Sequence, residues 1–238
     1  MFFYHVPKSG GTSIELHYQY CLGLNMPHVD ANEGIAPQDF DEAVILKTNM
    51  MHHISLFQDR PIKARAFGVF RHPIEVVQSE YYYLQVAEWE GGYNKNLGIE
   101  MTLEEYAATR PNRLIQNILM MGGQETTNVI TDEDLEKAKM ILRDYVLVGL
   151  MDRMEESLDR FDTFLDVSLL VSDKEKLERC RQEGRQKVNN SNKHPKLGQD
   201  SPEWQRIATH NQYDIALFEY AVELFAKQGE NFSTNSHK

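Results

Sequence analysis

The 238-residue sequence is poor in cysteine and in positive charge, and these shortages exclude two classes of protein. Its two cysteines, Cys21 and Cys180, cannot build a disulfide-dense scaffold, and they are compatible with either one bridge or two free thiols. Lys and Arg number 25 against 36 Asp and Glu, which gives a formal net charge of −11. Because nucleic-acid-binding proteins usually gain affinity from a basic surface, we expect no nucleic-acid partner.

Long apolar runs and metal motifs are also missing. No apolar stretch approaches the roughly 20 residues of a membrane-spanning helix. The first four residues lead directly into a polar turn, without the basic leader and small-residue cleavage site of a signal peptide. We therefore expect the chain as given to be soluble and to make no membrane contact. No motif of the CxxC type is present, and we expect no metal site.

What the sequence does contain is enough apolar material for one core, with 11 Phe, 11 Tyr and 2 Trp. Short β-prone runs at 2–6, 65–70 and 146–150 alternate with helical patterns at 12–22, 73–88, 131–144 and 153–165 and in a region beyond 201. This alternation predicts an α/β fold with a mainly parallel central sheet flanked by helices. Without a visible boundary, we expect one domain over 1–228 and a polar, disordered tail over 229–238.

Capping signals and loop residues refine this outline. Thr12 with Glu15 and Thr102 with Glu105 have the spacing of a capping box. Ser201 followed by Pro202 has the cap-then-proline form of a helix start. Residues 23–40 carry Gly, Pro and Asn and are typical of a long loop.

The strongest local signal is the segment 3–13 (FYHVPKSGGTS), which is typical of a strand, a glycine turn and a helix start. Such a turn directs backbone N–H groups outward, and the helix dipole adds positive potential, so it suits a phosphate or sulfate. The expected anion-binding residues are Lys8, Ser9, Gly10, Gly11, Thr12 and Ser13. The lysine precedes the glycines, unlike the Walker order. Taken alone, the segment is equally compatible with a capped turn that carries a surface lysine.

A second strand, basic turn and helix follow at 67–84 (FGVFRHPIEVVQSEYYYL). Arg71 stands where a parallel strand ends, at the edge where open α/β sheets bind ligands, and its planar fork suits a phosphate. Ser79 lies two turns into the helix and could donate to the same group. Each also has a plain interpretation, a surface salt bridge for Arg71 and an exposed helix serine for Ser79.

Together the two segments resemble the PAPS-dependent sulfotransferases, most closely the Golgi glycan branch that includes heparan sulfate 2-O-sulfotransferase. The resemblance continues at 148–158 and 211–221, in the same order along the chain. It implies a P-loop-type three-layer sandwich and the cosubstrate 3′-phosphoadenosine-5′-phosphosulfate (PAPS). The segment around Lys8 matches the 5′-phosphosulfate loop, and Arg71 with Ser79 matches the 3′-phosphate motif. His72 departs from the pattern, because the family usually has Asp there.

The resemblance also implies catalytic roles. Lys8 matches the lysine that stabilises charge on the bridging oxygen as the sulfuryl group leaves, and the family needs no metal. A histidine between the two motifs acts as the base; His53 is the better match here, and His52 is shifted by one position. The pair is also compatible with a surface loop. His5 is expected to be a structural neighbour of the loop. Lys193, in a late polar segment, is a candidate phosphate contact.

The implied function is transfer of the sulfuryl group from PAPS to a hydroxyl of a carbohydrate or glycan acceptor, in line and without a metal. Residues 174–196 hold eight basic against three acidic side chains, which fits a solvated helix or a groove for an anionic acceptor. A membrane anchor upstream of Met1 would place the chain in the Golgi lumen, as in many relatives. Two alternatives are a P-loop nucleotide kinase-like phosphotransferase and a noncatalytic nucleotide- or glycan-binding protein on the same fold. The sequence does not predict the oligomeric state.

Overall fold

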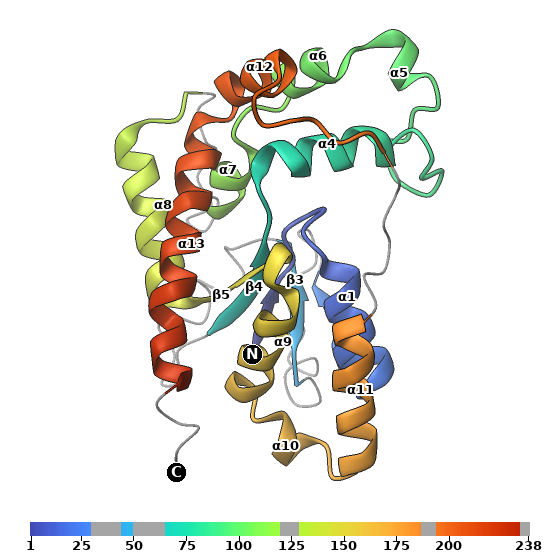
Figure 1. Cartoon of the computed structure of the whole chain (residues 1–238), viewed down its shortest axis with the longest axis vertical. Coiled ribbons are helices and arrows are strands. Elements are labelled where there is room, and N and C mark those ends of the chain that lie inside the picture. The colour runs from blue at the N-terminus through green and yellow to red at the C-terminus, as the bar shows by residue number, and fades with distance from the viewer. Residues whose placement is uncertain (30–43, 50–64, 120–128, 187–193, 234–238) are drawn as a thin grey trace.

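The computed structural model describes residues 1–29, 44–49, 65–119, 129–186 and 194–233 (Figure 1). Within these residues the centre of the molecule is a five-stranded sheet in which every pair of neighbouring strands is parallel. The strands, in spatial order, are β2 (His28–Val29), β3 (Leu46–Thr48), β1 (Phe2–Tyr4), β4 (Ala66–Phe70) and β5 (Val146–Leu150). The predicted α/β class with a parallel central sheet is confirmed.

The central strands are apolar because both of their faces are covered. All five residues of β4 (AFGVF) and all five of β5 (VLVGL) are buried, as is typical of parallel strands between helices. The first strand, β1, is equally buried and lies between β3 and β4, with Phe2 opposite both Leu46 and Ala66. The N-terminal residues of the chain therefore form the middle of the sheet.

One face of the sheet is covered by α7 (Arg113–Leu119), α8 (Asp132–Tyr145) and α13 (Gln212–Ser233) (Figure 1). Side chains from these helices pack on the strands around Tyr4, Phe70 and Val148. Leu142 of α8 and Phe225 of α13 are among the helix residues buried against them. Among the described residues, this is the largest of the apolar clusters.

The opposite face is covered by α1 (Gly11–Glu15), the π-helix η1 (Leu16–Cys21), α9 (Met154–Phe164), α10 (Val167–Leu170) and α11 (Lys174–Gln186), with a short 3-10 turn η3 (Met151–Arg153) before α9. Three aromatic rings in contact connect the layers on this side. Phe3 lies 5.3 Å from Phe67 between ring centroids, and Phe67 lies 4.8 Å from Phe161 of α9. With helices on both faces, the fold has three layers.

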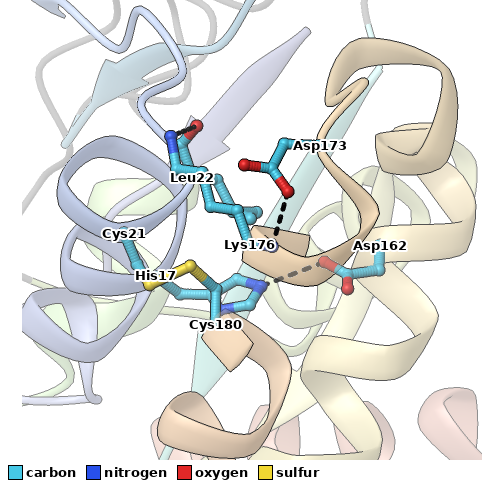
Figure 2. The surroundings of a disulfide bond; sticks show 7 residues. All are labelled: His17, Cys21, Leu22, Asp162, Asp173, Lys176 and Cys180. Atoms are coloured by element: carbon cyan, nitrogen blue, oxygen red, sulfur yellow. Dashed lines mark hydrogen bonds and ion pairs between the residues drawn. A yellow bond between two sulfur atoms is a disulfide. The ribbon is translucent and has the colours of Figure 1, made fainter. Parts of the chain in front are cut away.

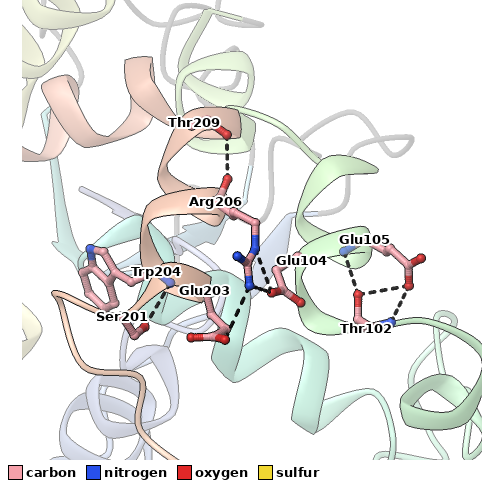
Figure 3. Close-up of polar contacts among 8 residues, drawn as sticks. All are labelled: Thr102, Glu104, Glu105, Ser201, Glu203, Trp204, Arg206 and Thr209. Carbon is pink, nitrogen blue, oxygen red and sulfur yellow. Dashed lines mark hydrogen bonds and ion pairs between the residues drawn. The ribbon is translucent and has the colours of Figure 1, made fainter.

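Beyond the carboxyl ends of the strands lies a smaller helical layer, formed by α4 (Pro73–Tyr83), α5 (Leu97–Glu100), α6 (Leu103–Ala108) and α12 (Pro202–His210) (Figure 1). Figure 3 shows how α12 is attached to α6: Arg206 donates to Glu104 over 2.7 Å. None of the described helices combines the length and the apolar character that crossing a membrane requires.

Some of the predicted helix caps are confirmed and one is wrong. The capping box of Thr102 and Glu105 is confirmed, and the Ser201 hydroxyl accepts from the Trp204 N–H at the start of α12 (Figure 3). The capping box predicted for Thr12 and Glu15 is wrong. The helix already begins at Gly11, and its N-cap is Gly10, which makes no side-chain cap and has a φ of 85°. A left-handed glycine therefore turns the chain where a hydroxyl cap was expected.

Several predicted boundaries are also corrected. The helix predicted over 12–22 changes into the π-helix η1 from Leu16, and the helix predicted over 73–88 ends at Tyr83. The stretch predicted as a loop over 23–40 contains β2, and β3 was not predicted. The helix α13 runs to Ser233, so residues 229–233 of the predicted disordered tail are helical.

The two cysteines form one disulfide, which resolves the alternatives that the sequence leaves open. Cys21 at the end of η1 is bridged to Cys180 of α11, 159 residues later (Figure 2). Beside the bridge, Asp162 of α9 accepts from Arg181 over 2.9 Å and lies 3.2 Å from His17 Nε2. The bridge and these polar contacts fasten α11 to the helix that follows the Lys8 loop.

A buried carboxylate, Asp214 at the start of α13, holds the first turn of α7. Its two oxygens accept from the N–H groups of Leu114, over 2.9 Å, and Ile115, over 2.8 Å. Burial raises the pKa of Asp214 from its ordinary 3.8 to about 6, although the two N–H donors and the charge of Arg113 oppose this shift. The folded protein therefore favours the protonated acid more than the unfolded chain does.

This pKa predicts a pH-dependent loss of stability. Since the folded-state pKa of Asp214 is raised, its contribution is complete below pH 3.8 and is lost as the pH rises through 6. Relative to Asp214→Asn, the free energy of unfolding of the wild type should fall by about 2 kcal/mol between pH 4 and pH 7. Urea unfolding of both proteins at several pH values measures this, and parallel pH curves would contradict it.

Candidate functional site

The two segments predicted to bind phosphate lie at the same edge of the sheet. The Lys8 loop follows β1 and the Arg71 turn follows β4, and these two strands are neighbours. After β1 the chain continues to β2, at one end of the strand order. After β4 it continues to β5, at the opposite end. The carboxyl ends of β1 and β4 therefore form a topological switch point, which is where open α/β sheets bind their ligands.

The two segments are in direct contact. Arg71 Nη1 donates to the carbonyl oxygen of Lys8 over 3.3 Å, while Arg71 Nε donates to Glu75 over 3.0 Å. Together the segments enclose a cavity of about 390 Å³. Six of the residues predicted from the sequence line it, namely Lys8, Gly10, Gly11, Thr12, Arg71 and Ser79.

Two other predicted residues do not reach this cavity. The hydroxyl of Ser9 is buried and donates to the carbonyl oxygen of Pro7. Ser13 lines a separate pocket that is bounded by the disulfide between Cys21 and Cys180. The remaining predicted residues, His52, His53 and Lys193, lie outside the described residues.

The backbone of the Lys8 loop is shaped to leave donors available. Both Lys8, with φ 58°, and Gly10, with φ 85°, adopt left-handed conformations. Among the described residues, the N–H groups of Gly10, Gly11 and Thr12 have no hydrogen-bond partner. Unpaired donors at a helix start are suited to an anion.

His5 packs against this loop and also lines the cavity. A Cβ atom on Gly11 would lie 1.9 Å from His5 Nε2, so any other residue at that position would require the His5 ring to move. The other ring nitrogen, Nδ1, lies 2.9 Å from Asn49 Oδ1. Burial lowers the pKa of His5, and the charge of Lys47 acts in the same direction. The ring is therefore neutral near pH 7 and retains one nitrogen without a proton.

Lys8 lies between aromatic and charged side chains. Its Nζ is 3.3 Å from the centroid of the Tyr83 ring, at the last turn of α4. Burial lowers the pKa of the Lys8 amine and the charge of Arg71 lowers it further, whereas Glu90 and Glu80 raise it. A bound anion would favour the charged amine in the same way as these carboxylates.

An ion-pair cluster that the sequence analysis did not single out completes the wall of the cavity. Glu80 accepts from Arg113 over 2.7 Å and from Arg110 over 3.3 Å, and both Glu80 and Arg113 line the cavity. The run 110–113 gives no motif from which this position could be predicted. Among the described lining residues, Lys8, Arg71 and Arg113 face two carboxylates, Glu80 and Glu90, which leaves a surplus of one positive charge.

His72, the departure from the family pattern, serves packing. Its ring lies 4.9 Å from that of Trp204 and 5.4 Å from that of Phe218. Burial lowers its pKa, and its Nδ1 has no hydrogen-bond partner among the described residues. The side chain is thus part of the aromatic contact between α4, α12 and α13 and does not line the cavity.

The chain that follows residue 193 runs along α4, the helix that carries Ser79. Gln78 Nε2 donates to the carbonyl oxygen of Pro195 over 2.6 Å, and the His194 ring stacks on Tyr82 at 5.0 Å.

Comparison of the sequence with models of known families gives no match, and comparison with curated proteins gives none either. The functional argument therefore depends on the residues and their geometry.

Proposed function

We propose that the protein is a PAPS-dependent sulfotransferase with a P-loop-type α/β fold, which transfers a sulfuryl group to a hydroxyl of a carbohydrate acceptor. The observation that carries the proposal is the contact between the Lys8 loop and the Arg71 turn around one cavity. Two anion-binding segments that share a cavity suit a ligand with two phosphate-type groups, and PAPS is such a ligand.

The lining residues fit the two ends of this donor. The unpaired N–H groups of Gly10, Gly11 and Thr12, with the Lys8 amine, would hold the 5′-phosphosulfate. Arg71 and Ser79 would hold the 3′-phosphate, since a guanidinium group can donate two parallel hydrogen bonds to phosphate oxygens. The contacts of Arg71 with Glu75 and the Lys8 carbonyl hold its guanidinium group beside the Lys8 loop, which supports this role.

The chemistry expected in this cavity is an in-line displacement. A bond forms between the acceptor oxygen and sulfur while the bond from sulfur to the bridging oxygen breaks, and its electron pair stays on the 5′-phosphate. The Lys8 ammonium would stabilise the charge that develops on that oxygen. The acceptor proton passes to a base, for which His53, with His52 beside it, stays the prediction from sequence. That the reaction needs no metal, and that Lys193 contacts phosphate, also remain predictions.

Binding of the spent donor, 3′-phosphoadenosine 5′-phosphate (PAP), tests the proposal without knowledge of the acceptor. Calorimetry should show binding to PAP that is tighter than binding to ATP. Arg71→Ala should weaken PAP binding about tenfold or more, because a hydrogen bond to a charged group is lost. Arg179→Ala, an exposed arginine of α11, is the matched control and should bind like the wild type. Absence of PAP binding, or tighter binding of ATP, would refute the donor assignment.

The disulfide indicates that the proposed activity takes place in an oxidising compartment. Bridges such as Cys21–Cys180 form and persist in oxidising environments and are rare in the cytosol. An oxidising lumen such as that of the Golgi is consistent with the bridge and with the glycan branch that the sequence resembles.

A further inference from the structure

An exposed aromatic side chain, Trp89, lies on the turn that follows α4 and contacts Tyr83, which lines the candidate donor cavity. It is 77% exposed, which is unusual for tryptophan. Its Nε1 donates to the Tyr83 hydroxyl over 3.0 Å, and that hydroxyl donates to Glu90 over 2.9 Å. The two rings lie 6.3 Å apart at an interplanar angle of 71°. The indole is therefore fixed in place at the surface by a hydrogen-bonded network.

This network leads to the proposed reaction centre. Tyr83 and Glu90 line the cavity, and the Tyr83 ring lies under the Lys8 amine. Ser79 and Tyr83 are four residues apart and share one face of α4. Along the chain, Arg71 comes just before α4, Ser79 and Tyr83 follow on the helix, and Trp89 comes after its end. Trp89 thus contacts the ring on which the Lys8 amine lies, and it follows that ring in the chain, whereas Arg71 and Ser79 of the proposed 3′-phosphate site precede it.

The charges on this side favour an uncharged ligand. The described lining of the cavity has a surplus of one positive charge, which a donor with two phosphate-type groups more than consumes. Trp89 itself is flanked by Glu88 and Glu90, and Tyr93 donates to Glu88 over 3.5 Å. A sulfated or carboxylated acceptor would meet these carboxylates and be repelled. Sugar hydroxyls, in contrast, can donate hydrogen bonds to them.

We propose that Trp89 binds the acceptor, and that the acceptor is an uncharged sugar whose ring packs against the indole. This inference rests on the proposed sulfotransferase function. The indole offers a broad apolar face and the carboxylates of Glu88 and Glu90 accept from hydroxyls, so a neutral sugar could present one of its hydroxyls to the Lys8 side of the cavity.

Tryptophan fluorescence gives a direct test, because the sequence has two tryptophans and the other one, Trp204, is buried. The protein is titrated with lactose, N-acetyllactosamine, cellobiose and mannobiose, and with an unsulfated chondroitin tetrasaccharide as the anionic probe. At least one neutral sugar should shift the emission to shorter wavelength, and the chondroitin probe should not. The shift should disappear in Trp89→Phe and persist in Trp204→Phe.

A kinetic variant tests the same residue in sulfate transfer. Trp89→Ala should raise the KM for the neutral acceptor about tenfold, because the stacking contact is lost. The kcat value and the affinity for PAP should stay within about twofold of the wild type. Tyr20→Ala, which removes a ring that is 70% exposed on η1 away from the cavity, is the matched control and should leave the KM unchanged.

The results separate the two proposals. Failure of PAP to bind refutes the sulfotransferase assignment, whereas the sugar titration can be read without any donor. The acceptor inference is overturned if none of the neutral sugars changes the Trp89 emission, if the chondroitin probe binds as well as they do, or if Trp89→Ala keeps the wild-type KM.

Discussion

Replacing Lys8 by alanine is expected to lower the rate of sulfate transfer by about 100- to 1,000-fold, the usual effect of removing one donor that stabilises transition-state charge. The amine lies inside the cavity, over the Tyr83 ring and beside Arg71. Transfer of labelled sulfate from PAPS to a panel of oligosaccharides measures the rate. The loss should appear mainly in kcat, since the charge that Lys8 stabilises develops as the bridging bond breaks.

The choice of alanine and a control variant make this result specific to the amine. Lys8→Ala leaves a residue with a Cβ at a φ of 58°, so the backbone cost at this position is retained, whereas glycine would remove it. Lys227→Ala removes an exposed lysine on α13, outside the basic segment 174–196, and should leave transfer unchanged. If Lys8→Ala transferred sulfate at the wild-type rate, Lys8 would have no catalytic role. If the wild type bound PAP but transferred sulfate to no acceptor, the noncatalytic alternative would be favoured.

Removing the disulfide is expected to lower the thermal midpoint of unfolding by about 10 °C. A bridge across 159 residues restricts the unfolded chain strongly, and removal of a native disulfide typically costs about 2–5 kcal/mol. In a protein of this size each kcal/mol corresponds to roughly 2–4 °C. Calorimetry of the oxidised protein and of the double variant Cys21→Ser, Cys180→Ser measures the difference.

A chemical control accompanies this experiment. The oxidised protein should contain no titratable thiol, and reduction should expose two. In the double variant, α11 keeps the contact of Arg181 with Asp162. It also keeps the contact of Lys176, which donates to the Leu22 carbonyl over 2.9 Å (Figure 2). We therefore expect the variant to fold with native helix content. Equal midpoints for the two proteins would show that the bridge does not stabilise the fold.

The parts of the fold that the sequence predicted well are those with strong local signals. The strands β4 and β5 are continuous apolar runs, and the starts of α6 and α12 carry side-chain caps. The strands β2 and β3 have two and three residues, and β3 contains a lysine. Such short segments are strands because they pair with a neighbour, and pairing is a tertiary property that local composition does not encode.

In the candidate site, too, some features could be predicted from local signals and others depend on tertiary contacts. The approach of Lys8 to Arg71 could be predicted, since both follow parallel strands whose carboxyl ends meet at one edge. Arg113, Tyr83 and Glu90 reach the cavity from helices and turns whose placement depends on packing against the rest of the chain. The pairing of Cys21 with Cys180 was likewise open, because spacing alone cannot decide between a bridge and two thiols.

The direction of the strands also has a practical consequence. Since β1 is the central strand and its carboxyl end carries the Lys8 loop, Met1 leaves the sheet at the opposite edge, and α13 also ends on that side of the molecule (Figure 1). A purification tag, a fluorescent fusion or a linker to a sensor chip placed before Met1 would point away from the cavity. The cavity of a protein immobilised in this way would stay accessible to soluble ligands.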